Sequence, residues 1–147
     1  MQIDNRTFFE QITALLREGR GVQIAIRGNS MRPLLRNGRD IAVLRPCRGD
    51  ECRPGDVVLF RHEGRHVLHR IIRRHDAGFL LRGDGNYRLE EQCTTDDILA
   101  LMTGVIRPSG RLVSCHSRRW RWTSRPWLTL PRLIRRLCLA TVSRLSA

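Results

Sequence analysis

The residue whose chemistry stands out in this chain is a serine, Ser30, in the segment Gly28-Asn29-Ser30-Met31-Arg32-Pro33. A serine hydroxyl is a weak nucleophile at neutral pH and needs an adjacent base. Lysine is not available for that task, because all 27 lysine-plus-arginine positions of the chain are arginine. The best-placed alternative is His69, in Val67-Leu68-His69-Arg70-Ile71-Ile72. Imidazole is the natural general base near neutrality, so the sequence predicts a Ser30–His69 pair.

A third candidate is Asp84, in the segment Gly83-Asp84-Gly85-Asn86. A carboxylate beside an imidazole holds its tautomer and stabilises the charge that develops during proton transfer. Asp84 is therefore the candidate third member of the site. The backbone N–H of Ser30 is a candidate oxyanion donor, since the serine follows a strand and lies at a turn.

These segments, together with Pro54-Gly55-Asp56-Val57-Val58-Leu59-Phe60 and in this order, resemble the type I signal peptidase family and its self-cleaving repressor relatives. More narrowly, the segments resemble the archaeal and endoplasmic-reticulum branch of this family, in which histidine replaces lysine. The resemblance covers about residues 20–107 and implies a coiled antiparallel β-sheet domain. It implies a serine endopeptidase that binds an extended peptide as an added strand and cuts after small residues.

The resemblance also implies roles for individual residues. Ser30 matches the nucleophile, His69 the general base, and Asp84 an aspartate that supports either the histidine or the structure of the site. Glu90 is the nearest match to a second acid, although that branch has aspartate there. Met31 and Pro33, which flank the serine, are the candidate substrate-binding residues.

Each of these residues also has a purely structural interpretation. Ser30 could cap a helix. His69 shares a strand face with Val67 and Ile71 and could be a core histidine. Asp84 lies among residues that favour tight turns. The surrounding motifs favour catalysis for Ser30 and His69 and leave Asp84 open.

Metal and cysteine chemistry are less favoured. His62, His66 and His69 would converge on a helix, but the segment predicts a hairpin in which His62 and His66 flank the turn and are exposed. Cys47 and Cys52 have no second pair with which to form a zinc site, and five irregularly spaced cysteines argue against a disulfide framework. The sequence thus predicts neither a metal nor a cofactor.

The hydrophobic pattern predicts a mainly β domain over residues 1–107, which begins with a helix over 4–19 and is followed by a basic tail over 108–147. Strands are expected at 22–26, 41–44, 56–60, 67–72, 78–81 and 99–106, and a weak one at 112–113. The turn of the 56–72 hairpin is expected at Glu63-Gly64. An amphipathic helix is expected from about Pro131, since proline is favoured in a first helical turn.

Charge is unevenly distributed: residues 107–147 hold ten arginines and no acidic residue, and they also contain all three tryptophans. Such a tail could contact a membrane through 118–142, pack on the domain or bind nucleic acid; the first two are favoured. No signal segment or apolar run of membrane-spanning length is present in the sequence. A cytoplasmic or peripheral membrane location is therefore expected, with a peptide or preprotein as substrate. The alternatives are an inactive peptide-binding module and a repressor-like regulator.

Overall fold

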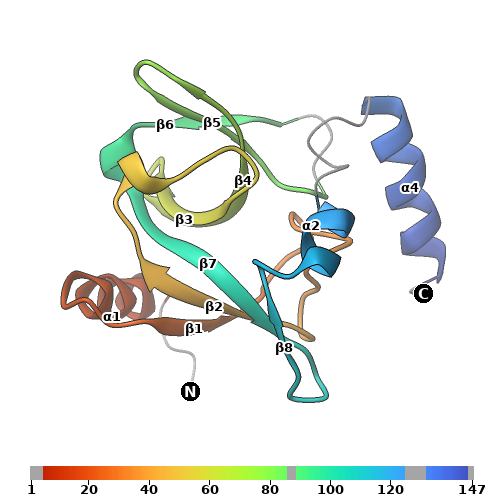
Figure 1. Cartoon of the computed structure of the whole chain (residues 1–147), viewed down its shortest axis with the longest axis horizontal. Coiled ribbons are helices and arrows are strands. Elements are labelled where there is room, and N and C mark those ends of the chain that lie inside the picture. Colours follow the sequence, from red (N-terminus) through yellow and green to blue (C-terminus); the bar gives the residue numbers. More distant parts are fainter. Residues whose placement is uncertain (1–4, 86–88, 125–131, 146–147) are drawn as a thin grey trace.

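A single curled antiparallel sheet forms the centre of the molecule (Figure 1). The structure, a computed structural model, describes residues 5–85, 89–124 and 132–145. The strand order is β1-β2-β7-β3-β4-β5-β6, and β8 pairs with the end of β7. The strands are β1 (Val22–Ala25), β2 (Ile41–Pro46), β3 (Val57–His62), β4 (Arg65–His75), β5 (Gly78–Arg82), β6 (Glu91–Cys93), β7 (Ile98–Ile106) and β8 (Leu112–Ser114). This arrangement confirms the predicted mainly β fold.

Three register shifts interrupt the strand pairing, at Val43/Leu44, Leu59/Phe60 and Ile71/Arg73. Irregularities of this kind bend a strand and increase its right-handed twist. The sheet therefore curls into a half-barrel, and its first strand comes to lie opposite β4 across a groove.

The predicted N-terminal helix is α1 (Asn5–Arg17). Its apolar residues recur at helical spacing, and Ile12 and Leu16 are buried against the sheet. Gly19 ends the helix in a left-handed conformation (φ 80°), with Gly19 N–H donating to Leu16 O and Arg20 N–H to Leu15 O. Such a glycine cap satisfies carbonyl groups that the helix leaves without a partner.

The hairpin of β3 and β4 turns at the two predicted residues. Glu63 (φ 49°) and Gly64 (φ 75°) both have positive φ. Two-residue turns of that kind match the twist of the flanking strands. The hairpin register pairs Val58 with His69, which sets the position of the histidine relative to the sheet.

In the described residues after β8, the C-terminal part contains the helices α2 (Arg118–Ser124) and α4 (Arg132–Leu145). α4 confirms the predicted helix, whereas α2 and the short strand β6 are not predicted by the sequence pattern. β8 pairs with β7, and Trp120 of α2 is buried in the same core cluster as Leu16 and Leu35, so these parts of the tail pack on the sheet domain. Within the described residues, no helix is long and apolar enough to cross a bilayer.

The core has two clusters. One joins α1 to β1, β2 and β7, and the other lies within the curl of β3 to β6. Phe60 and Phe79, both fully buried, belong to the second. Burying a side chain of this size stabilises a protein by roughly 1.5–3 kcal/mol. The second cluster therefore fixes β4 and β5, the strands that carry the candidate base and lead to the Gly83 turn.

Candidate active site

Ser30 lies in the connection between β1 and β2, where the strand gives way to a series of turns. Gly28 has a positive φ (78°), and its N–H donates to Asn37 Oδ1 at 3.2 Å. Ser30 is exposed, whereas the next residue, Met31, is buried. The connection thus presents the serine at the surface and anchors itself through its neighbour.

Asp40, at the end of this connection, binds several of its residues through hydrogen bonds to its carboxylate. It is buried, and it accepts hydrogen bonds from the Arg36 backbone N–H at 2.9 Å and from the Arg39 side chain at 2.9 and 3.0 Å. Arg107 of the β7–β8 loop lies 2.8 Å from the same carboxylate. Burial by itself would raise the pKa of Asp40, but the hydrogen bonds from Arg39 and Arg36 and the charge of Arg107 outweigh it and hold the pKa below its usual value.

A carboxyl group with a lowered pKa in the folded state stabilises the fold above its unfolded-state pKa of about 3.9, and that contribution is lost as the pH falls through the folded-state value. We expect Asp40→Asn to lower the free energy of unfolding near neutral pH by about 3 kcal/mol. The difference between the variant and the wild type should shrink in acid. Urea unfolding at several pH values checks this, with Asp76→Asn, an exposed turn residue, as the control. A difference between Asp40→Asn and wild type that is the same at every pH would contradict it.

His69 lies on β4 and is only 5% exposed. Its Nδ1 is 3.0 Å from Glu91 Oε2, on β6. A carboxylate accepts hydrogen bonds, so this contact favours the neutral tautomer that carries its proton on Nδ1 and its lone pair on Nε2. The buried histidine is thus oriented as a general base would be.

Gly83 brings the serine loop and the histidine to the same small space. A Cβ added to Gly83 would overlap with Ser30 O and would lie 3.0 Å from His69 Nε2. Nε2, the ring atom not engaged by Glu91, therefore faces the serine loop. The next glycine is equally close: a Cβ on Gly85 would overlap with Asn29 O, and Gly85 N–H donates to Ser30 O at 2.8 Å.

Asp84, between those glycines, does not contact the histidine. Its carboxylate accepts two hydrogen bonds from Arg70, Nε to Oδ1 at 2.8 Å and Nη2 to Oδ2 at 2.7 Å. Arg70 Nη1 also donates to Gly55 O at 2.8 Å. Both charged side chains are almost completely buried. The ion pair ties the Gly83–Gly85 turn to β4 next to His69, so Asp84 supports the structure of the site.

The carboxylate at the imidazole belongs to Glu91, and neither predicted acid is found there. Glu90 lies 3.5 Å from Arg82 Nη1 and is partly exposed. The sequence leaves open whether Asp84 supports the histidine or the structure of the site, and whether Glu90 is a second acid; in the structure the partners of these two carboxylates are Arg70 and Arg82. Successive strand residues point to opposite faces, so a shift of one position changes which carboxylate reaches the histidine.

A groove of about 700 Å³ is lined by Ser30 and by residues of α1, β1 and β4. One side is formed by residues 23–27, which belong to β1 and to the segment that directly follows it. The other side is formed by His66, Val67 and Leu68 of β4. Phe8 and Phe9 of α1 and Met31 also belong to the lining. Of the two predicted substrate-binding residues, the structure thus places Met31 in the groove, and Pro33 is not among the residues that line it.

His66, expected to be exposed at the hairpin turn, is half-buried instead. Its ring stacks on Phe9 with centroids 4.7 Å apart, and its Nε2 lies 3.4 Å from Thr13 Oγ1. Burial and the nearby Arg61 lower the pKa of His66. His66 and His69 therefore have separate partners, and within the described residues no three His, Cys, Asp or Glu side chains are grouped to hold a metal.

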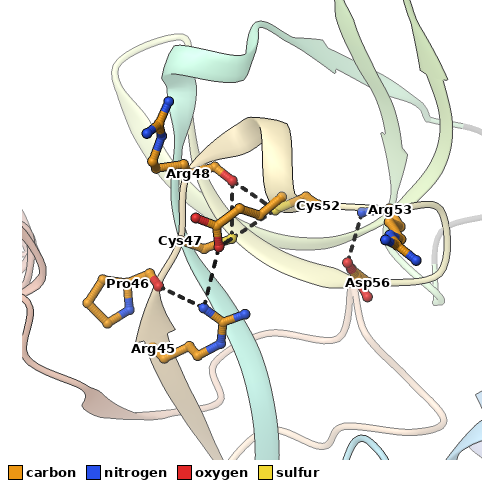
Figure 2. A network of polar contacts seen from close by, with 8 residues as sticks. Arg45, Pro46, Cys47, Arg48, Cys52, Arg53 and Asp56 are labelled. Atoms are coloured by element: carbon orange, nitrogen blue, oxygen red, sulfur yellow. Dashed lines mark hydrogen bonds and ion pairs between the residues drawn. The ribbon is translucent and has the colours of Figure 1, made fainter.

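Cys47 and Cys52 lie side by side in the connection between β2 and β3 (Figure 2), with their sulfur atoms 3.2 Å apart. Both thiols are close to the Arg48 carbonyl oxygen, at 3.2 and 3.7 Å. Burial raises the pKa of both thiols. Since the thiolate is the reactive form, this environment disfavours a cysteine nucleophile here.

The Ser30 carbonyl oxygen and His69 Nε2 both border the space beside Gly83, and Ser30 also lines the groove. Comparison with known proteins identifies the family. Residues 2–102 match the family described as Peptidase S24-like, and the chain belongs to it. It is also related to the type I signal peptidases.

The curated relatives include the signal peptidase complex catalytic subunit SEC11C of human (Homo sapiens), mouse (Mus musculus) and dog (Canis lupus familiaris). Each is 36% identical over 70 residues, which is 43% of this chain and 36% of the relative. The match thus spans about a third of the length of these relatives. No solved structure matches the chain significantly.

Gly83 supplies a test of the site geometry. We expect Gly83→Ala to reduce peptide cleavage at least about 100-fold, because the added methyl group must displace the Ser30 carbonyl and a small misplacement of reacting groups has an effect of that size. The matched control is Gly104→Ala, whose Cβ meets first the flexible end of Leu112 at 2.9 Å. Steady-state cleavage and thermal unfolding of both variants give the comparison. Equal cleavage by the two would show that Gly83 does not border the reacting groups.

The Arg70–Asp84 pair predicts a large effect on stability. We expect Asp84→Asn to lower the free energy of unfolding by about 3–5 kcal/mol, since it leaves the Arg70 charge buried without its partner. Asp50→Asn removes an exposed pair with Arg48 and should change the same quantity by no more than about 0.5 kcal/mol. Urea unfolding measures both. A loss for Asp84→Asn as small as that of the control would contradict the structural role.

Proposed function

We propose that this chain is a serine endopeptidase in which Ser30 is the nucleophile and His69 the general base. Ser30 Oγ attacks the scissile carbonyl carbon while His69 Nε2 accepts the hydroxyl proton. The imidazolium then gives that proton to the leaving amine, and water hydrolyses the acyl-serine in a second step. Glu91 accepts the Nδ1–H and stabilises the positive ring. The Ser30 backbone N–H donates to the oxyanion.

The observation that carries this proposal is the convergence at Gly83. Ser30 and His69 are far apart in the sequence, yet both border the space that a Gly83 side chain would fill. The ring atom that faces this space is the one a base would use, and the other ring atom is held by a carboxylate. A histidine that only filled the core would not need this orientation toward an exposed serine.

We propose that the substrate is an extended peptide that pairs with β1. β1 is the first strand in the sheet order, and an edge strand offers backbone groups for an added strand. The groove beside it is lined largely by apolar residues, including Ile24, Met31 and Leu68, and Ser30 also lines it. A peptide aligned on β1 would run toward the serine.

The relatives are named as catalytic subunits of a signal peptidase complex, and this supports a preprotein or leader-bearing peptide as the substrate, cut after small residues. The test is to incubate the full chain with peptides that contain Ala-x-Ala-type sites followed by further residues, and to analyse products by mass spectrometry. Wild type and Ser30→Ala are compared at equal concentration. Cleavage by wild type alone supports the proposal. Peptide binding without cleavage by either form would favour a peptide-binding module.

A further inference from the structure

Exposed large apolar side chains are present on both α2 and α4. Trp122 of α2 is 81% exposed, and on α4 Leu133, Ile134 and Leu137 are 64%, 44% and 59% exposed. We call these four residues the α2–α4 surface. Exposed large apolar side chains are usually scattered singly on a protein surface, so four of them within residues 122–137 indicate an interaction site.

The three α4 residues fall on one side of the helix. Leu133 and Leu137 are four positions apart, and Ile134 and Leu137 three, which are the separations of neighbours on a helical face. α2 is fixed to the domain by Trp120, which is buried, while Trp122 two positions later is exposed. α4 lies at the side of the molecule beyond α2, away from the sheet (Figure 1).

The part of the sequence that carries this surface has charge of one sign. Residues 107–147 contain ten arginines and no acidic residue, and Arg118, Arg119 and Arg121 of α2 belong to this stretch. The remainder of the chain is close to balanced, with seventeen arginines and fourteen acidic residues. The partner of this surface must therefore be anionic and must also accept aliphatic side chains.

We infer that the α2–α4 surface binds the face of an anionic lipid bilayer. A bilayer meets both requirements, since its phosphate groups can bind the arginines and its acyl chains can bind Leu133 and Ile134. Tryptophan is favoured at the headgroup level. Nucleic acid would satisfy the arginines and stack on Trp122, but it would leave the aliphatic side chains in water. α4 has 14 residues, about 21 Å of helix at 1.5 Å per residue, so it lies along the surface and does not cross a core of about 30 Å.

This inference is independent of the proposed peptidase function, since none of its residues lines the groove or contacts Ser30 or His69. The test is flotation of the full chain with vesicles of phosphatidylcholine alone and of phosphatidylcholine mixed with phosphatidylglycerol. Wild type should float with the anionic vesicles, weakly with the neutral ones, and less at high salt, because screening weakens attraction between surface charges.

Leu133→Ser/Ile134→Ser should reduce the partition into anionic vesicles at least about tenfold, since two apolar side chains no longer enter the acyl region. The matched control is Leu112→Ser on β8, which removes a leucine of similar exposure (60%) from the same basic part of the chain and should float as wild type does. Cleavage of a water-soluble peptide should be unchanged in both variants.

Three results would overturn the inference. One is equal flotation with neutral and anionic vesicles. Another is unchanged partition of the Leu133→Ser/Ile134→Ser variant, which would leave only nonspecific charge attraction. The third is absence of flotation combined with tight, salt-sensitive binding of the full chain to a DNA duplex, which would assign the surface to nucleic acid.

Discussion

Ser30→Ala and His69→Ala are each expected to lower kcat/KM for peptide cleavage by about 10⁴-fold or more, and the double variant should be no slower than either single one. The reason is that the two side chains act as a unit: without the imidazole the hydroxyl is not activated, and without the hydroxyl the imidazole has no proton to take. Cleavage rates of the three variants form a double-mutant cycle that reports this coupling directly.

The controls are Ser109→Ala, an exposed serine in the β7–β8 loop, and His62→Ala, at the hairpin turn. Both should cleave as wild type does. Losses for Ser30→Ala and His69→Ala that multiply in the double variant would contradict a shared step. Circular dichroism of every variant separates loss of chemistry from loss of fold, which matters most for His69 because it is buried.

Glu91→Gln is expected to lower kcat by about 10²- to 10⁴-fold with a smaller effect on KM, the range that follows from replacing the carboxylate of a catalytic triad by an amide. The introduced amide can donate to Nδ1, which would place the proton on Nε2, the atom that must accept it from Ser30. The amide also provides no charge to stabilise the imidazolium. Steady-state kinetics at several substrate concentrations separate kcat from KM.

The matched control is Glu90→Gln, the same substitution one residue earlier. Its carboxylate pairs with Arg82 and is partly exposed, so its loss should change kcat less than about threefold. A larger kcat loss for Glu90→Gln than for Glu91→Gln would show that the wrong carboxylate has been assigned to His69.

The sequence predicts most of this fold because its signals are local. α1 follows from apolar residues at helical spacing ended by Gly19, and the β3–β4 hairpin from a two-residue turn at Glu63-Gly64. α2 is not predicted because its Arg/Trp composition has no apolar period. Its Trp120 is buried in the core, and this tertiary contact is not visible in the sequence pattern. β6 has only three residues and no pattern that indicates a strand, and it exists because it pairs with β5.

The candidate site is predictable in part, because its motifs are also local signals in the sequence. Motifs identify Ser30 and His69, and the structure brings both to the Gly83 turn. Motifs do not identify the carboxylate at the histidine, because it depends on the pairing of β5 with β6, which places Glu91 opposite Leu81. Asp84 lies in a motif typical of a catalytic residue, but its carboxylate is hydrogen-bonded to the buried guanidinium of Arg70. No sequence pattern predicts this pairing of Arg70 with Asp84.

The most direct test of the account is to trap the acyl-enzyme. Wild type is mixed with a cleavable peptide, quenched in acid during the first turnovers, and analysed by intact-mass and peptide-mapping mass spectrometry. The account predicts an adduct equal in mass to the N-terminal product less water, located on Ser30 and absent from Ser30→Ala, which should not cleave. Cleavage that is undiminished in Ser30→Ala, or an adduct on any other residue, would contradict it.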